Sequence, residues 1–402
     1  MAFDVFRVRG LFPALIDGYV HLDSPTATLV PESVSRAVAE AIRVPYAPPE
    51  GPSVASARAA AVLTAARRAV ADLTGGDPAG VILGPDPTTI TYTLARTLAK
   101  TWRIGDEIVV SRLDHDANIR PWVHAASYAG ATVRWAEVDV ETCELPTWQY
   151  EQLINEHTKF VAITAASSVV GTRPEVRKIA DMAHAVGALV HVDGVHASTH
   201  MPIDVADLGA DFFVTAANTW CGPHIAAAVA APEVLDRLHP DKLVPTPDSV
   251  PERFEGSPMA YELLAGLPAA VDHLAALDPA ATGSRRERVL ASMAAVEDYE
   301  RGLFARLVSG LRWLSPVTLM GDAGTSKRAP TVAFMFSGHK PRAVVEELAR
   351  RKISAWDGDC YAHELMEAVG AAELGGVIRV GLAHYTSAYD VDRLLDTLQD
   401  FH

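Results

Sequence analysis

Cysteine and lysine are scarce in this 402-residue sequence, and each shortage limits what the protein can do. The cysteines stand far apart and form no CxxC pair, so we expect neither a disulfide framework nor a bound metal such as structural zinc. They are Cys143, Cys221 and Cys360. Lysine occurs only at Lys100, Lys159, Lys178, Lys242, Lys327, Lys340 and Lys352.

Long apolar segments are missing as well. No stretch of 18 or more uninterrupted apolar residues is present, and the N-terminus has no basic segment leading into an apolar one. We therefore expect a cytoplasmic protein without a membrane contact. The formal net charge of -15 disfavours nucleic acid and anionic membranes as partners and favours small molecules.

Short apolar runs alternate with helix-length segments through the first half of the chain. Runs that are apolar on both faces are typical of buried parallel strands joined by helical crossovers. We predict an α/β fold with a mostly parallel sheet flanked by helices, among them Ser53–Leu73 and Thr88–Ala99. The predicted strands are Gly80–Leu83, Glu107–Val110, Thr132–Trp135, Phe160–Thr164, Leu189–Val192 and Phe212–Thr215.

The length predicts one large and one smaller domain, because single cores stop growing near about 250–300 residues. A segment rich in proline and charge, His239–Gly256, separates them. We assign an N-terminal segment to 1–20, the large domain to 21–265 and a small C-terminal α/β domain to 266–402. In the small domain we predict helices over Ser284–Ser309 and Asp390–Phe401, and strands over Thr331–Phe336, Ile353–Asp357 and Val377–Leu382.

Ligands of open α/β sheets bind at the carboxyl ends of the strands, so the residues that follow each strand are candidates for the site. After the first strand, a turn opens a helix whose free N–H groups, with the hydroxyls of Thr88 and Thr89, could hold a phosphate or carboxylate. An N-cap at Asp86, with Pro87 in the first turn, explains the same residues without a ligand. Both interpretations stay open.

Three further candidates carry ionisable side chains. His115 follows the second predicted strand and could stack on a flat ligand or move protons near neutral pH. Asp193 ends what should be a central strand, where a carboxylate is costly unless a cation or a donor meets it. His196, one turn later, is either a second base or a supporting donor.

Eight short segments stand in a definite order along the chain: Phe12–Leu15, Gly84–Thr89, Leu113–Asn118, Thr164–Ser168, Val192–His196, Gly222–His224, Trp356–Asp359 and Arg379–Tyr385. This succession resembles the cysteine-desulfurase-like branch of the class V aminotransferases. Those are fold-type I pyridoxal phosphate (PLP) proteins, usually homodimers with active sites shared between subunits. The resemblance implies their fold and a homodimer that acts on a small molecule.

The resemblance also implies roles for individual residues. His115 corresponds to the histidine that stacks on the pyridine ring, and Asp193 to the carboxylate that pairs with the pyridine nitrogen. Thr88 and Thr89 match the helix start that takes the cofactor phosphate. Arg379 matches the arginine that grips the substrate carboxylate.

Other positions depart from the family pattern. The Schiff-base lysine falls at Thr219, and threonine supplies neither the imine nor the amine that shuttles the α-proton. No covalently bound cofactor is therefore expected. The remaining departures are Ala216 for a hydroxyl donor, Asn218 for a histidine or tyrosine, Ser168 for an asparagine, the N-terminal turn Asp23–Ala27, and Gly256–Pro258 for the phosphate-binding pair of the partner subunit.

Besides Arg379, we take Asn118, Trp220 and Cys360 as candidate substrate contacts. Trp220 is also explained by repacking beside the altered lysine position. Cys360 lies near the small-domain loop that carries the desulfurase nucleophile, but one position away, and the adjacent Asp359 should raise its pKa. We expect it to line the site rather than to accept sulfur.

Three functions fit these residues. In the first, an enzyme without covalent PLP acts on an amino-acid-derived carboxylate, with His115, Asp193 and His196 as acid–base groups. Family analogy places such an enzyme in a biosynthetic pathway. Thr219 would then be a weak nucleophile, a donor or a space-filler. In the second, PLP or its amine form PMP is held non-covalently, with Ser168 and Asn218 among its contacts. In the third, the protein is a scaffold without activity.

Overall fold

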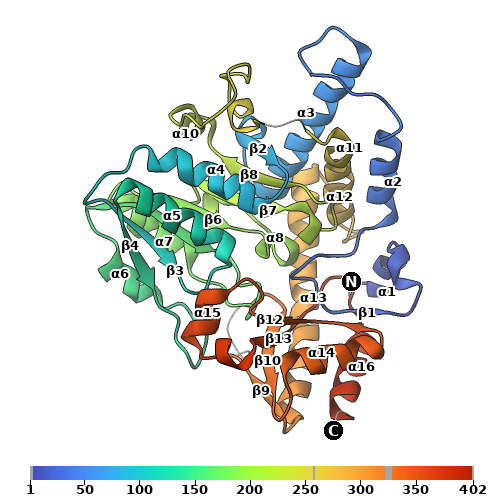
Figure 1. The fold of residues 1–402 in the computed structure, drawn as a ribbon. Helices are drawn as coiled ribbons and strands as arrows, with labels where there is room; N and C mark the ends of the chain where they lie inside the picture. Colours follow the sequence, from blue (N-terminus) through green and yellow to red (C-terminus); the bar gives the residue numbers. More distant parts are fainter. Residues whose placement is uncertain (1–2, 257–258, 322–327, 401–402) are drawn as a thin grey trace.

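The computed structural model describes residues 3–256, 259–321 and 328–400 and contains a seven-stranded sheet as its largest element (Figure 1). The strand order is β2-β8-β7-β6-β5-β3-β4. This is the expected α/β class. The strands are β2 (Val81–Gly84), β3 (Glu107–Ser111), β4 (Thr132–Ala136), β5 (Thr158–Thr164), β6 (Leu189–Asp193), β7 (Phe212–Ala216) and β8 (Ala226–Ala230).

Strand β8 lies within this sheet but was not among the predicted strands. It pairs antiparallel with both β7 and β2, whereas β3 to β7 pair in parallel. Its sequence is four alanines and one valine, and alanine has a low preference for strands, so the run gave no strand signal. The sheet is therefore mostly parallel, with one antiparallel insertion.

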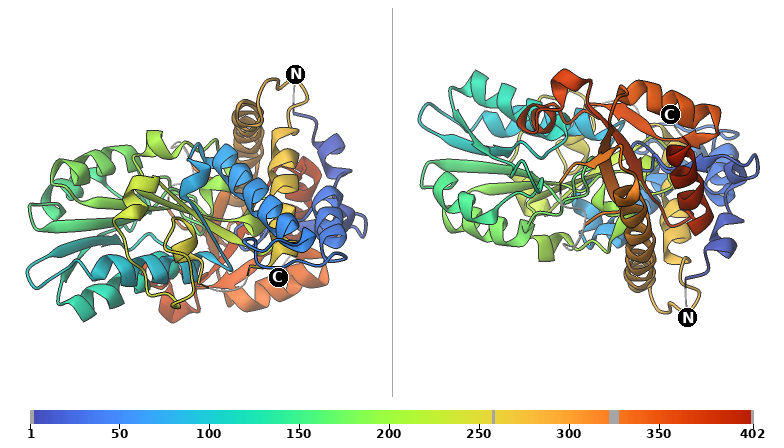
Figure 2. Two further views of the ribbon diagram at one scale, coloured as in Figure 1. Left: turned by 90° about the horizontal axis from the view of Figure 1, so that it is seen from above. Right: turned by 90° about the horizontal axis from the view of Figure 1, so that it is seen from below.

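Both faces of the sheet are covered by helices, and Figure 2 shows the layers from above and below. Neighbouring residues of one strand enter different cores: Ile108 belongs to one and Val109 to the other. This explains why the strands are apolar throughout. The helices α4 (Pro87–Ala99) and α5 (Arg120–Ala129) cover one face, and α3 (Val54–Thr74), α7 (Val176–Ala185) and α12 (Gly266–Ala275) contribute to the other core.

A four-stranded antiparallel sheet, in the order β12-β13-β10-β9, forms the C-terminal part. The predicted strand over 353–357 is divided in two, because β11 pairs with the N-terminal strand β1 instead of joining this sheet. The elements are β1 (Val20–His21), β9 (Val317–Leu319), β10 (Thr331–Phe336), β11 (Ile353–Ser354), β12 (Trp356–Gly358), β13 (Val377–Gly381), α14 (Pro341–Arg350) and α16 (Ala388–Gln399).

The long helix α13 (Arg285–Trp313) joins the two parts. Its first half packs into the core of the large sheet through Met293, and its second half into the C-terminal core through Leu307. The helix therefore contributes to both cores. The passage from one core to the other lies within α13, later in the chain than residue 265, where we predicted the large domain to end. The remaining helices are α1 (Val5–Arg9), α2 (Glu32–Ala41), α6 (Tyr150–Leu153), α8 (Ala197–His200), α9 (Val205–Leu208), α10 (Pro232–Asp236), α11 (Tyr261–Leu264) and α15 (His363–Ala368).

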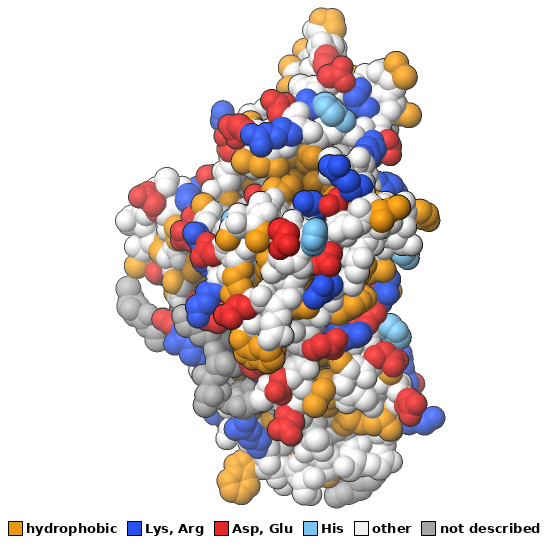
Figure 3. Space-filling model, turned by 90° about the vertical axis from the view of Figure 1, so that its left-hand side faces the viewer, with side chains coloured by type: hydrophobic (Ala, Val, Ile, Leu, Met, Phe, Trp, Pro, Cys, Tyr) orange, Lys and Arg blue, Asp and Glu red, His pale blue; other side chains and the backbone are white. Residues whose placement is uncertain are grey.

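The acidic side chains of the surface lie among basic ones. On the face shown in Figure 3, basic and acidic side chains are interspersed. Among the described helices, none combines the length and the apolar character that crossing a membrane requires.

Gly194, directly after β6, is required by packing. A Cβ atom built on it would lie 1.8 Å from the Cζ atom of Phe213, which is completely buried. We expect Gly194→Ala to lower the free energy of unfolding by about 1–3 kcal/mol, as in other overpacked cores. Urea denaturation measures the change.

The matched control is Gly302→Ala in α13, where a Cβ would meet nothing within 4 Å. An alanine there should stabilise the protein by about 0.5–1 kcal/mol, because glycine is costly inside a helix. Equal stability of the two variants would contradict the packing argument.

Candidate functional site

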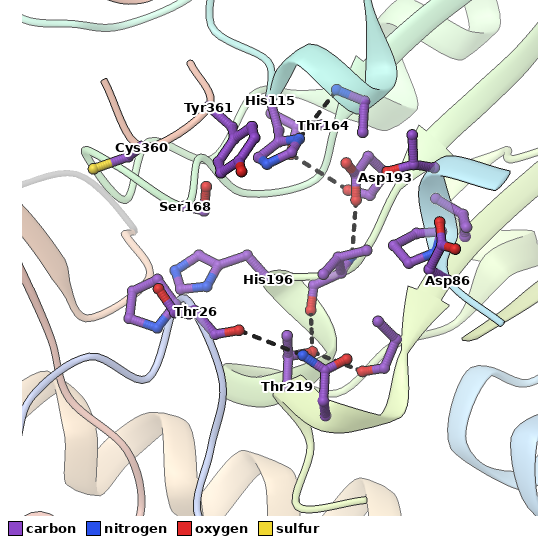
Figure 4. A pocket seen from close by; sticks show the side chains of 18 of the residues that line it. Thr26, Asp86, His115, Thr164, Ser168, Asp193, His196, Thr219, Cys360 and Tyr361 are labelled. Atoms are coloured by element: carbon purple, nitrogen blue, oxygen red, sulfur yellow. Dashed lines mark hydrogen bonds between the residues drawn. The ribbon is translucent and has the colours of Figure 1, made fainter. Parts of the chain in front are cut away.

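One cavity of about 330 Å³ lies at the carboxyl ends of β5, β6 and β7, between the large sheet and the C-terminal part (Figure 4). Its lining combines strand ends, the start of α4, an N-terminal turn and the small-domain strands. The described residues that line it are Pro25, Thr26, Asp86, Pro87, Thr88, Thr91, His115, Ala117, Thr164, Ala166, Ser168, Asp193, Val195, His196, Val214, Ala216, Asn218, Thr219, His224, Trp356, Cys360, Tyr361 and Arg379.

Asp193 is the last residue of β6 and reaches the cavity with 8% of its surface exposed. Its Oδ1 atom accepts a hydrogen bond of 2.9 Å from the Val195 N–H. Burial raises the pKa of its carboxyl from an ordinary value of 3.8 to about 6, because the charged form loses water. The carboxyl can therefore give or take a proton near neutral pH.

Asp193 acts electrostatically on a second buried carboxyl, that of Asp114. Burial, opposed by hydrogen bonds from Ser111 and Asn118, raises the pKa of Asp114 to about 8. The Asn118 Nδ2 atom donates to Asp114 Oδ1 over 2.6 Å, and its Oδ1 accepts from Trp122. Asn118 thus lies outside the described lining of the cavity, with both polar ends occupied.

His115 lines the cavity, and one face of its ring stacks on Tyr361 at a centroid distance of 5.4 Å. The Ala117 N–H donates to His115 Nδ1 over 3.1 Å, so Nδ1 carries the lone pair and Nε2 the proton of the neutral ring. Burial and, to a lesser extent, Arg379 lower the pKa of His115 to about 4. At neutral pH the ring is a neutral hydrogen-bond donor at Nε2.

His196 also lines the cavity and is 3% exposed (Figure 4). Its Nε2 lies 3.0 Å from the Thr331 hydroxyl, and its Nδ1 is buried with no hydrogen-bond partner among the described residues. Burial and the neighbouring His200 hold its pKa well below the usual range. A neutral ring with one uncommitted nitrogen suits proton transfer with a ligand.

Thr219 follows β7 and lines the cavity, but its hydroxyl is turned to the main chain. The Oγ1 atom lies 2.7 Å from the Val195 carbonyl oxygen and 2.9 Å from that of Ala216. Its proton is therefore held by carbonyls rather than by a base, which disfavours a nucleophilic role. Trp220 points into the core, where it donates to Thr215, and it does not line the cavity.

The start of α4 is capped by its own sequence. Asp86 accepts hydrogen bonds of 2.7 Å from both the N–H and the hydroxyl of Thr89, and Pro87 has no N–H to offer. Thr88 lines the cavity, whereas Thr89 does not. The N-cap interpretation accounts for this turn, and a phosphate there would meet a carboxylate in place of free donors.

Arg379 on β13 is 4% exposed and forms an ion pair of 2.8 Å with Asp23. Its Nη2 also donates to the Thr26 hydroxyl, its Nη1 lies 3.5 Å from the Ser168 carbonyl oxygen, and its Nε has no partner among the described residues. The guanidinium is thus half occupied, with donors remaining for an anion.

Cys360 and Asn218 complete the expected set at the cavity. Cys360 is 3% exposed, and burial raises the pKa of its thiol to about 11, so the thiol is protonated at neutral pH. Asn218 Nδ2 lies 3.4 Å from the Thr26 carbonyl oxygen. No lysine belongs to the described lining, while Lys327 and residues 257–258 lie outside the described residues.

Several cavity residues were not among the sequence candidates. Thr26 and Tyr361 come from turns distant in sequence, and nothing in their local pattern indicated the cavity. Asp114 could have been found, because Asp114, Asn118 and Trp122 recur at the four-residue spacing of a helix face. His224 ends one of the recognised segments and also lines the cavity.

Known proteins resemble this chain along nearly its whole length. The family model of Aminotransferase class-V matches residues 20–394. An uncharacterized protein of Mycobacterium tuberculosis is 41% identical over 399 residues, with 99% of both chains covered. A cysteine desulfurase of Pectobacterium atrosepticum is 31% identical over 425 residues, covering 100% of this chain and 99% of the relative. The crystal structure of the cysteine desulfurase CsdA of Escherichia coli has a TM-score of 0.85 at 25% identity, covering 99% of this chain and 98% of that one.

The raised pKa of Asp193 makes stability depend on pH. Below pH 4 the carboxyl is protonated in the folded and unfolded states, and above pH 6 folding must bury a charge. We expect Asp193→Asn, which keeps an acceptor for Val195, to gain stability relative to the parent between pH 4 and pH 6. At 1.36 kcal/mol for each pH unit, the gain levels off at about 3 kcal/mol.

Urea denaturation across pH 3.5–8 measures this difference, with Asp298→Asn, an exposed site, as the control for removing one carboxylate. A gain that is the same at pH 3.5 and pH 8 would show that the carboxyl is not titrating in this range.

Proposed function

The chain belongs to the class-V aminotransferase family, in its cysteine-desulfurase-like branch, and on this premise we propose an enzyme that acts on an amino-acid-derived carboxylate without lysine-bound PLP. One observation carries the proposal. Thr219, which by the family resemblance takes the place of the lysine, has its hydroxyl bound to main-chain carbonyls, while Asp193, His196 and Arg379 line the same cavity.

PLP does not fit this cavity in the family's binding mode. Asp193 and His115 occupy places suited to a pyridine ring, but no described lining residue can form an imine. The phosphate position is also altered, because Asp86 occupies the donors at the start of α4 and brings a negative charge there. We therefore route no chemical step through this cofactor.

The remaining groups support binding and proton transfer. The free Nε and weakly engaged Nη1 of Arg379 would bind a substrate carboxylate. Asp193, with a pKa of about 6, would accept or donate a proton at its carboxyl. His115 would donate from Nε2, and His196 would exchange a proton at Nδ1. Cys360 would line the site as a neutral thiol. A biosynthetic role and a homodimer are proposed from the family alone.

The second candidate is an enzyme that holds PLP or PMP non-covalently. The placement of Asp193 beside His115 favours it, since these two residues would support the ring without an imine.

Mixing the purified protein with PLP separates the candidates. We expect no visible absorption band of an imine and, after borohydride treatment and peptide mapping, no pyridoxyl group on any one lysine at stoichiometric yield. Equilibrium dialysis then shows whether PLP is retained without labelling, which would favour the second candidate.

A single lysine labelled in proportion to the protein would overturn the proposal. Lys327→Ala would establish whether that residue is the one that reaches the site, and Lys352→Ala, at a lysine outside the described lining, is its control.

Arg379 and Asp23 allow a sharper test of carboxylate binding. Pyruvate, L-alanine and L-cysteine serve as probes in isothermal titration calorimetry. We expect Arg379→Gln to weaken the best binder at least about tenfold, because a hydrogen-bonded charge is lost. Asp23→Asn should tighten binding, because it removes the negative charge that pairs with the Arg379 guanidinium.

Circular dichroism and thermal unfolding verify that both variants are folded. Unchanged affinity in folded Arg379→Gln, or no binding of any probe to the parent protein, would exclude Arg379 as the carboxylate site.

A further inference from the structure

A second polar cluster lies just beyond the cavity, in the same loop as Thr219. Cys221 follows Thr219 by two residues but does not line the cavity. Its Sγ atom lies 3.7 Å from Nε2 of His384, which follows β13, and that nitrogen lies 3.3 Å from Nε2 of His273 on α12. The three ligand atoms all lie within 4.8 Å of one another. The three residues are 0%, 0% and 7% exposed, respectively.

Hydrogen bonds alone do not satisfy this cluster. Nε2 of His384 carries either one proton or one lone pair, so it can serve only one of its two close neighbours. The other ring nitrogen of His384 is buried with no partner among the described residues. A polar group that is buried without a hydrogen bond costs free energy. This cost indicates that the cluster of Cys221, His273 and His384 has a further partner.

The distances fit a tetrahedral metal ion. Zinc lies about 2.0–2.1 Å from histidine nitrogen and about 2.3 Å from cysteine sulfur, so two nitrogens stand about 3.3–3.4 Å apart and a sulfur and a nitrogen about 3.5–3.6 Å apart. The observed 3.3 Å between the two nitrogens and 3.7 Å between the sulfur and Nε2 of His384 agree with this geometry. The third pair, the sulfur and Nε2 of His273, lies within 4.8 Å, so a bound ion would draw these two atoms closer together. In that arrangement one ion receives a lone pair from all three atoms.

The backbone at Cys221 holds the sulfur in place at a conformational cost. Its φ of 67° lies in the left-handed region, which a residue other than glycine rarely adopts. The Cys221 N–H donates to the Thr28 hydroxyl over 2.7 Å, and this bond fixes the turn. A strained residue that is fixed by its neighbours often marks a functional position.

A buried carboxyl is available to balance a cation. Glu300 on α13 is 1% exposed, lies 2.9 Å from His200 and acts electrostatically on Cys221. Its Oε1 atom has no partner among the described residues. Burial raises the pKa of the Glu300 carboxyl well above its usual range, so it would offset the charge of an ion only in the ionised form that a bound cation favours.

We propose that Cys221, His273 and His384 bind one zinc ion, with a water at the fourth position. Thiolate and imidazole together are ligands that suit zinc. The ion would join the loop after β7 to α12 and to the segment after β13, and so fix the floor beside the cavity. This inference reverses the expectation of no metal, because ligands from three distant segments leave no spacing motif in the sequence.

Elemental analysis of protein purified without chelator should give about one zinc per chain. After the zinc is stripped, Co²⁺ added to the parent protein should produce a thiolate-to-cobalt charge-transfer band. Cys221→Ser should lose this band. Cys143→Ser should keep it, and it is a matched control because Cys143 is also free, fully buried and at positive φ.

A parent protein without zinc that gives no cobalt band would overturn the proposal, as would a band that persists in Cys221→Ser. If that variant does not fold, His273→Gln keeps the thiol and should weaken Co²⁺ binding at least tenfold, and unchanged affinity would also overturn the proposal. These readouts involve neither PLP nor a carboxylate, so they are independent of the proposed enzyme function.

Discussion

The loss of water around the carboxyl end of the large sheet is the constraint on which the site depends. Burial moves the pKa of Asp193 and Asp114 upward and that of His115 and His196 downward, so each of the four is displaced toward its uncharged form. Arg379 forms an ion pair with Asp23. At neutral pH the site therefore combines the neutral rings of His115 and His196 with the Asp193 carboxyl, whose pKa is about 6, and the partly paired Arg379 cation. Such a set is suited to moving protons on a bound anion, and poorly suited to carrying a large net charge.

The departures from the family pattern are physically connected. Thr28 directly follows the Asp23–Ala27 turn. Its N–H and its hydroxyl both donate to the carbonyl oxygen of Asn218, and the same hydroxyl accepts a hydrogen bond from the Cys221 N–H. The altered N-terminal turn and the altered lysine loop therefore form one hydrogen-bonded unit. A change on one side requires an accommodating residue on the other. Under the proposed loss of the lysine, this coupling would explain why Thr219, Asn218 and the Asp23–Ala27 turn change together.

The sequence predicted most of the fold and part of the site, for reasons that particular residues illustrate. Strands with β-branched residues, such as β6, were found because both faces are buried, whereas the alanines of β8 carry no such signal. The position of Asp193 followed from the rule that ligands lie at strand ends. Asn118 and Trp220 lie outside the described lining of the cavity, because their hydrogen-bond partners, Asp114 and Thr215, decide where they point. Proximity in sequence to a functional residue does not determine that direction.

In the loop after β7, the proposed zinc ion would replace the lysine-bound cofactor as the link between this loop and the rest of the molecule. In the family, a lysine in this loop is tied through the cofactor to the rest of the site. Here the hydroxyl of Thr219 binds main-chain carbonyl oxygens. Two residues later, Cys221 approaches histidines from α12 and from the segment after β13. A metal ion at that point would connect the same loop to the same two parts of the molecule. The cavity could then keep its shape without a covalent cofactor, and this would free its acid–base groups for a different substrate.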